Sequence, residues 1–195
     1  MSIPEQKVIA DELLDCLSII CPNVILAGGA PRDWYMNKEA NDLDIYFSLY
    51  EGTASSHSYQ LERVLPKGVK KVKTEFEGNT NPLYKHMKHL KRIYYMEYKG
   101  LDVQLILLNE AKDVWRAVDN IDCSICKIWY KNSVIHTTTP FLKTMKTKFM
   151  FLNEDYNWSD YHPKKMVDRF KPLGYYASTE KQCDDRLIKM AIEEL

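Results

Sequence analysis

The chain has 195 residues, of which 45% are hydrophobic, and its 27 lysine and arginine residues balance its 27 aspartate and glutamate residues. This length suits one domain, and the hydrophobic fraction allows a packed core without disulfide bonds or a structural metal. A net charge of zero excludes a global electrostatic field as the means of holding an anionic partner, so any such partner needs a local patch.

The cysteines and the first residues of the chain indicate a cellular compartment. Five cysteines, an odd number, and a start that lacks a basic and then apolar run predict reduced thiols and a cytoplasmic protein. No apolar stretch approaches the roughly 18 residues of a transmembrane helix, so we expect no membrane association. The abundance of tyrosine, lysine and asparagine is compatible with a virus-encoded protein that acts in the host cytoplasm.

The first hundred residues predict alternating helices and strands. Helices are indicated by apolar residues three or four positions apart and by prolines or glycines at their ends. Strands are indicated by alternation and by β-branched and aromatic residues, with Lys99 and Gly100 as a two-residue hairpin turn. In chain order we expect a helix over 5–20, a strand over 24–27, a helix over 31–36, a strand over 42–47, a helix over 53–65, and strands over 69–76, 93–98 and 101–108.

The rest of the chain predicts shorter elements. These are a helix over 111–118, a hairpin of strands over 124–130 and 134–138 around Asn132 and Ser133, and helices over 163–170 and 183–195. The whole pattern predicts an α+β fold, in which helices pack on a mixed β-sheet. We expect a core over residues 1–140 and a short helical C-terminal extension over 141–195.

Three aspartates form the most informative pattern in the sequence. Asp42 and Asp44 lie two apart on one predicted strand, so their side chains point to the same face, about 7 Å apart. Carboxylates placed this way repel each other unless a cation lies between them, and Mg²⁺ prefers oxygen ligands. Asp102 interrupts an otherwise apolar strand, where a carboxylate is costly to bury, unless it is a residue of the hairpin near Gly100 that simply faces water. If the two strands are neighbours, the three carboxylates can hold two Mg²⁺ or Mn²⁺ ions about 3.5–4 Å apart, which suits in-line phosphoryl transfer.

The turn formed by Gly28 and Gly29 predicts an anion site. Glycine lets the backbone approach a ligand closely, and the helix that follows presents unpaired backbone N–H groups. Arg32 lies one turn into this helix, where it either contacts a phosphate or forms an ion pair on the helix surface. We interpret Asp33 as an internal cap or as part of a salt bridge that holds the turn. An NTP would then place its β- and γ-phosphates at the turn and its α-phosphate between the metals.

These residues resemble those of a known group. Gly28-Gly-Ala-Pro-Arg-Asp33, followed by Asp42-Leu-Asp-Ile45, resembles the signature of the DNA polymerase β-type nucleotidyltransferase superfamily, and most of all its branch of CCA-adding enzymes and bacterial poly(A) polymerases. The segment Asp122–Tyr130 is similar to that branch's Asp-Phe-Thr-Ile-Asn-Ala-Leu-Ala-Tyr, without the two arginines that precede it there. The resemblance covers residues 20–130. It implies a palm-like catalytic sheet, two Mg²⁺ ions, an NTP donor and transfer of NMP to a hydroxyl with release of pyrophosphate.

The resemblance also implies an acceptor, the 3′ end of an RNA such as tRNA. Two basic runs, over 67–73 and 85–92, would suit a phosphate backbone, and tyrosines flank the second, although charged runs are more often solvated faces. Three alternatives stay open. The acceptor is a protein hydroxyl, or it is a small molecule, or the chain is a non-catalytic module that binds nucleotide or RNA.

Overall fold

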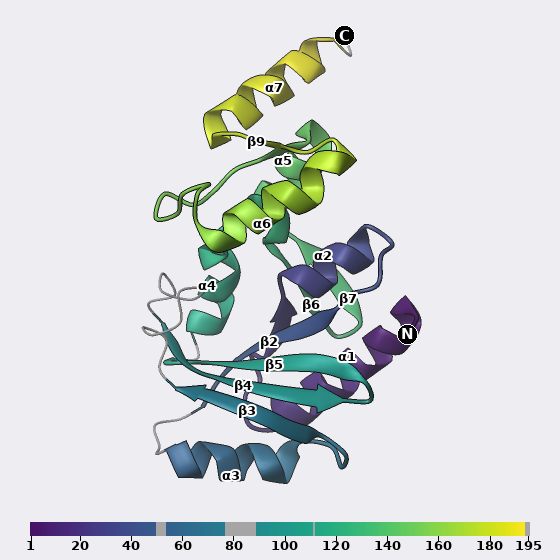
Figure 1. Cartoon of the computed structure of the whole chain (residues 1–195), viewed down its shortest axis with the longest axis vertical. Helices are drawn as coiled ribbons and strands as arrows, with labels where there is room; N and C mark the ends of the chain where they lie inside the picture. The colour runs from purple at the N-terminus through teal and green to yellow at the C-terminus, as the bar shows by residue number, and fades with distance from the viewer. Residues whose placement is uncertain (50–53, 77–88, 111, 194–195) are drawn as a thin grey trace. The chain divides into compact units, whose positions relative to one another are not determined.

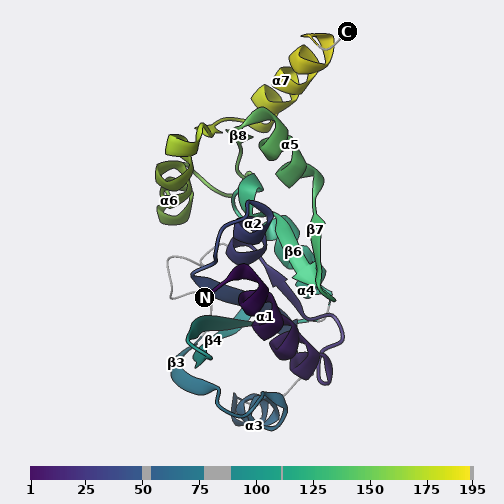
Figure 2. The same cartoon turned by 90° about the vertical axis from the view of Figure 1, so that its right-hand side faces the viewer.

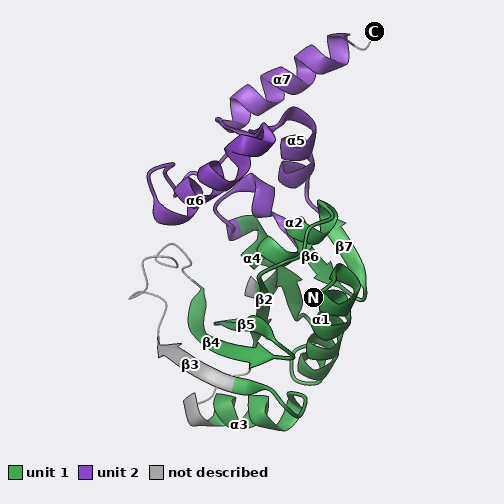
Figure 3. Cartoon of the chain, turned by 45° about the vertical axis from the view of Figure 1, so that its right-hand side comes forward, with its two compact units in different colours: residues 1–119, 129–136 green, residues 120–128, 137–195 purple. Residues whose placement is uncertain are grey.

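The computed structural model describes residues 1–49, 54–76, 89–110 and 112–193 of the chain (Figure 1). Two compact units divide it: unit 1 comprises residues 1–119 and 129–136, and unit 2 comprises residues 120–128 and 137–195 (Figure 3). Helices and a mixed sheet together give an α+β fold, as the sequence predicts. The expectation of a core over 1–140 with an extension over 141–195 stays a prediction.

A seven-stranded mixed sheet forms most of unit 1, in the order β3-β4-β5-β2-β1-β6-β7. The central strands β2 and β5 run parallel, whereas β1 is antiparallel to both β2 and β6, and β4 is antiparallel to both β3 and β5. The strands are β1 (Ile25–Ala27), β2 (Asp42–Ser48), β3 (Lys70–Phe76), β4 (Leu90–Tyr98), β5 (Leu101–Leu108), β6 (Ile128–Lys131) and β7 (Val134–Thr137).

Two hairpins of this sheet have the turns that the sequence predicts. Lys99 and Gly100 have φ angles of 51° and 82°, and Asn132 and Ser133 have φ angles of 51° and 59°. Positive φ at both central residues is characteristic of the turn whose twist matches that of the flanking strands. The turns therefore set the register of β4 against β5 and bring β7 back beside β6.

Helices α1 (Ile3–Ser18), α2 (Gly29–Tyr35), α3 (Ala54–Val64) and α4 (Asp113–Asn120) complete unit 1 (Figures 1 and 2). A capping box begins α1, since the backbone N–H of Ser2 donates to the Glu5 carboxylate at 2.7 Å. The apolar side of α1 packs on β1 and β2 and also contacts α3. Leu43 and Ile45 of β2 are fully buried, because they point to the helix-covered face of the sheet.

Unit 2 is mainly helical. Its helices α5 (Thr139–Thr147), α6 (Tyr161–Phe170) and α7 (Glu180–Glu193) are accompanied by the 3₁₀ turns η1 (Ser124–Cys126) and η2 (Lys171–Leu173) and by a two-stranded parallel sheet of β8 (Phe149–Met150) and β9 (Tyr176–Ala177). Among the described residues of both units, no helix is both long and apolar enough to cross a lipid bilayer.

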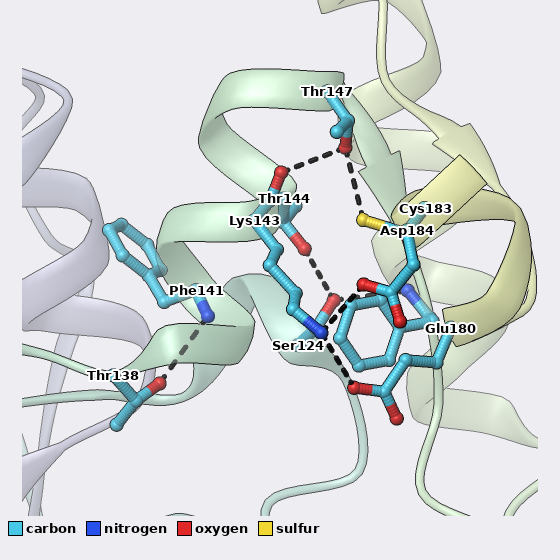
Figure 4. A network of polar contacts seen from close by, with 10 residues as sticks. Ser124, Thr138, Phe141, Lys143, Thr144, Thr147, Glu180, Cys183 and Asp184 are labelled. Atoms are coloured by element: carbon cyan, nitrogen blue, oxygen red, sulfur yellow. Dashed lines mark hydrogen bonds and ion pairs between the residues drawn. The ribbon is translucent and has the colours of Figure 1, made fainter. Parts of the chain in front are cut away.

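A polar network joins the elements of unit 2 (Figure 4). The Ser124 and Thr144 hydroxyls lie 2.7 Å apart, and Thr147 Oγ1 lies 3.2 Å from Cys183 Sγ. Burial raises the pKa of the Cys183 thiol. Lys143 forms ion pairs with Asp184 at 2.7 Å and with Glu180 at 3.2 Å, so that α5 is tied to α7.

The structure differs from the predicted elements mainly after residue 120. Residues 124–126, predicted as part of a strand, form a 3₁₀ turn, and β6 begins only at Ile128. The sequence pattern also missed α5, although Thr138 caps it and Pro140 lies in its first turn, both typical of a helix start. The last helix begins three residues before the predicted position, at Glu180.

Candidate active site

The register of two neighbouring strands places the three predicted aspartates on one face of the sheet. In the parallel pair of β2 and β5, Asp42 lies opposite Asp102, and Asp44 lies opposite Gln104. Neighbouring strands are about 4.8 Å apart, and paired residues point to the same face. Asp44 shares this face because it lies two residues after Asp42. The structure therefore makes neighbours of the two strands, which the sequence alone left open.

The side chains of this row differ in exposure. Asp42 and Asp44 are half-buried, whereas Asp102 is exposed, so the expectation that its carboxylate bears a cost of burial is wrong. Gln104 Nε2 donates a long hydrogen bond of 3.4 Å to Asp42 Oδ2. Across the described residues, no three acidic, histidine or cysteine side chains already converge as a group that could hold a metal ion. The donor atoms of this row are carboxylate and amide oxygens, and oxygen ligands are those that Mg²⁺ prefers, so the chemistry of the row fits that ion.

The opposite face of the same strands explains why the register is firm. Leu43 and Ile45 are 0% exposed, and their partners Val103 and Leu105 on β5 are also buried. A slip of one residue would turn every side chain of β2 to the other face, which would bury Asp42 and Asp44 and expose the leucine and isoleucine. The hydrophobic layer thus holds the carboxylate row toward the other side of the sheet.

The glycine turn follows β1, the strand beside β2. Gly28 has φ 86° and ψ −121°, a backbone conformation that only glycine adopts readily, and it forms the N-cap of α2. A Cβ atom added to Gly28 would meet no atom within 4 Å. Glycine is therefore needed at this position for the path of the backbone, and space remains open beside it.

Arg32 lies beneath this turn and is 2% exposed. Its Nε donates to Asp33 Oδ1 at 2.9 Å, and both side chains of this ion pair are buried. Its Nη2 would lie 3.7 Å from a Cβ atom on Gly29. The interpretation of Asp33 as part of an internal salt bridge is confirmed, whereas the interpretation of Arg32 in a surface ion pair is wrong, because α2 packs this pair against β1 and β2.

Sequence reasoning missed Gln104, whose amide contacts Asp42. The signal was present, since Gln104 lies two residues after Asp102 and therefore on the same face of a strand. In the first basic run, over 67–73, Lys67 and Lys70 are exposed. Residues 85–88 of the second run lie outside the described residues.

The segment that begins at Asp122 is divided: residues 122–128 belong to unit 2, whereas Trp129 and Tyr130 belong to unit 1. Asp122 is buried, and its Oδ1 accepts a hydrogen bond of 2.7 Å from the Cys123 backbone N–H. Its Oδ2 lies 2.6 Å from His162 Nδ1. Burial, with the charge of Asp122 as the next cause, raises the pKa of Tyr156 to about 12. Asp122 therefore organises the polar interior of unit 2.

Comparison with known proteins gives one family and one fold. A model of the Gabija anti-defense 2 family matches residues 6–148. An apo CCA-adding enzyme is similar in structure with a TM-score of 0.60 and 16% identity, over 98% of this chain and 43% of that one. A CCA-adding enzyme in complex with ATP is similar with a TM-score of 0.56 and 17% identity, over 98% of this chain and 42% of that one. The Thermotoga maritima CCA-adding enzyme in complex with tRNA is similar with a TM-score of 0.56 and 16% identity, over 97% of this chain and 42% of that one.

At identities this low, the likeness to these solved structures shows a shared fold. The chain spans about two fifths of the length of the three enzymes. A search of curated proteins found no significant match.

Proposed function

The chain belongs to the Gabija anti-defense 2 family, and we propose that it is a metal-dependent nucleotidyltransferase that acts against the defence system in the family's name. The reaction would transfer NMP from an NTP to a hydroxyl acceptor and release pyrophosphate. The observation that carries this proposal is the register of β2 and β5, which sets Asp42 level with Asp102 and keeps Asp44 on the same face. The fold, similar to that of CCA-adding enzymes, supports it.

Each aspartate has a role in the proposed reaction. Asp42 and Asp44 would hold both Mg²⁺ ions, and Asp102 would hold the ion on the acceptor side; Mn²⁺ accepts the same oxygen ligands. When bound, the ions supply positive charge where negative charge develops on the phosphoryl oxygens. Asp102, exposed at the side of the row, would accept the proton of the attacking hydroxyl. A bond then forms between that oxygen and the α-phosphorus as the bond to pyrophosphate breaks.

The glycine turn would hold the leaving group. Gly28 and Gly29 follow β1 directly, next to the strand that carries Asp42 and Asp44, and the open space beside Gly28 allows a phosphate to approach the backbone. Arg32 would contribute positive charge from beneath the turn and hold its shape through the ion pair with Asp33. Because this arginine is buried, we propose that it acts on the triphosphate without leaving its position.

Two acceptors have support of different kinds. An RNA 3′ end, tRNA-like, is the first choice, since one of the similar enzymes was solved with tRNA bound. A protein hydroxyl is the second, because the family name describes action against a defence system, and covalent modification of a defence protein is a direct means of such action. With a small-molecule acceptor or a non-catalytic module, the experiment below would leave both RNA and protein without label.

The experiment is an incubation of the purified protein with Mg²⁺ and each α-labelled NTP in turn, with total tRNA or with proteins of a defended cell. Label in the RNA that disappears with Asp44→Asn would establish transfer to RNA and name the nucleotide. Label on a protein would establish the second acceptor. The matched control is Glu97→Gln: Glu97 lies opposite Asp102 on β4 but is already paired with Lys70 at 3.1 Å. Transfer that persists at full rate in Asp44→Asn would refute the proposal.

A further inference from the structure

Four residues of unit 1 form a surface group that the proposed reaction does not use, here named the aromatic patch: Trp115, Trp129, Lys131 and His136. The ring of Trp129 stacks on His136 with centroids 3.8 Å apart and planes 8° apart. Trp115 meets Trp129 edge to face at 5.1 Å. Lys131 Nζ lies 5.9 Å from the Trp115 ring centroid. The patch thus combines three flat rings with a cation.

The aromatic patch lies on the same sheet face as the carboxylate row. Trp129 of β6 pairs with Ala27 of β1, and Leu26 pairs with Ile45 of β2. Because neighbours along a strand alternate in direction, Trp129 and Ala27 share the face of Asp44. Trp129 and Asp44 are therefore two strands apart, which is about 10 Å.

Exposure distinguishes this patch from an ordinary packing cluster. On the helix-covered face of the same sheet, Trp34 and Tyr130 also meet edge to face, at 5.2 Å, but both are buried. In the patch, Trp115 is 43% exposed, and Trp129 and His136 are half-buried. Exposed aromatic faces next to a cation are the features with which proteins stack nucleobases and neutralise the phosphates between them.

We propose that the aromatic patch is a stacking platform for bases of a single-stranded nucleic acid whose end reaches the carboxylate row. The inference rests on the proposed function, because it supplies the acceptor with a path to the reacting atoms. The position of Lys131 favours a nucleic-acid strand, and not the base of the NTP, as the ligand of the aromatic patch. Its Nζ donates to the Pro22 carbonyl, which precedes β1, whereas Gly28 follows β1. A cation at that end would meet the phosphates of a nucleic-acid strand, since we propose that the triphosphate of the NTP lies at the glycine turn.

Binding without turnover provides the test. Labelled single-stranded oligoadenylate RNA is titrated with the full chain in EDTA, with fluorescence anisotropy and tryptophan quenching as the readouts. Trp115→Ala should weaken binding about tenfold, as expected for the loss of one stacked base, and Trp115→Phe should restore part of it. Tyr59→Ala is the matched control, because Tyr59 is 60% exposed and lies 5.6 Å from the Arg63 guanidinium on α3, away from the patch. If the two alanine variants weaken oligonucleotide binding equally, or if neither variant weakens it, the proposal of a stacking platform is wrong.

Two further measurements separate the possible failures. ATP affinity in Mg²⁺ should be unchanged by Trp115→Ala; loss of ATP affinity with intact oligonucleotide binding would assign the patch to the donor base and overturn our inference. Asp44→Asn should still bind the oligonucleotide. If the wild-type chain binds RNA through Trp115 but transfers nothing to any acceptor, the proposed function fails and the platform stands. If the Trp115→Ala variant labels RNA as well as the wild-type chain does, the platform fails and the proposed function stands.

Discussion

The two units of the chain place carboxylates in opposite settings. In unit 2, Asp122 is held between the Cys123 N–H and His162, and Asp184 and Glu180 share Lys143. In unit 1, Asp42 meets the neutral amide of Gln104 at 3.4 Å, and Asp102 is exposed beside it. The contrast teaches that the acids of unit 2 are held by cationic or hydrogen-bonding groups of the fold, whereas Asp42 and Asp102 of unit 1 meet a neutral amide and solvent. The predictions for the carboxylate row and for Asp122 test the two sides of this contrast.

The largest effect is expected in the carboxylate row. Asp44→Asn or Asp102→Asn should reduce NMP transfer by on the order of a thousandfold, because the loss of a metal ligand removes several kcal/mol of charge stabilisation from the transition state. The stability of Asp102→Asn should be unchanged, since Asp102 is exposed. Labelled transfer and thermal melting measure the two quantities on the same preparations. A large drop in melting temperature would show that these acids serve the fold as those of unit 2 do.

The glycine turn should give the next largest effect. Gly28→Ala should cost about 1–3 kcal/mol of unfolding free energy, because φ 86° with ψ −121° is strained for any residue with a Cβ. Gly29→Ala is the matched control, since its Cβ would meet Arg32 Nη2 at an ordinary contact distance of 3.7 Å. Urea denaturation of both variants gives the comparison. Equal losses of unfolding free energy in the two variants would mean that steric space for a Cβ atom, and not backbone conformation, restricts the residues of the turn.

A smaller effect on stability alone is expected from Asp122. Asp122→Asn should lower the unfolding free energy by about 1 kcal/mol, because the amide still accepts from the Cys123 N–H but no longer offers a carboxylate oxygen to His162 Nδ1. Glu154→Gln, an exposed acid of the same unit, serves as the control for a change of charge. Denaturant unfolding followed by a probe in unit 2 measures the difference. An unchanged midpoint would contradict the view that this acid serves the fold.

The smallest effect concerns pH and unit 1. Hydrogen bonds from Lys99, at 2.5 Å, and from Tyr98 lower the pKa of Glu12 below its ordinary value of 4.5. The stability that Glu12 contributes is therefore fully present above pH 4.5 and is lost as the pH falls through the lowered value. Glu12→Gln should flatten this part of the curve of stability against pH. If the curves of stability against pH are parallel for the wild-type chain and Glu12→Gln, the contact of Glu12 with Lys99 and Tyr98 contributes nothing to stability.

The sequence predicted most of unit 1 because its signals are local. Alternation over 42–47 and the turn at Lys99 and Gly100 depend on neighbours in the chain, and both appear in the structure. The pairing of Asp42 with Asp102 depends on which strands become neighbours, which no local pattern specifies. The burial of Arg32 depends likewise on the packing of α2 on the sheet. These two long-range outcomes decide the geometry of the candidate site.

Unit 2 was predicted less well for a related reason. Its elements are short, and polar residues such as Ser124, Thr144 and Thr147 form part of its interior, so hydrophobic periodicity is weak. The start of α5 carries a local signal in Thr138 and Pro140, but the strand-like residues before it outweighed that signal in the sequence. The 3₁₀ turn at Ser124–Cys126 is set by contacts with residues 144 and 151, far along the chain.

The parallel pairing of β2 with β5 also has a consequence for the order of events on the ribosome. Asp42 and Gln104, which touch across this pair, are 62 positions apart, and the intervening chain includes α3, β3 and β4. Parallel strands need such a crossover, and long-range pairings form slowly because a large loop must close first. A nascent chain therefore carries Asp42 and Asp44 well before it carries the strand that completes their row. A product that stops before β5 lacks Asp102 and cannot form the row.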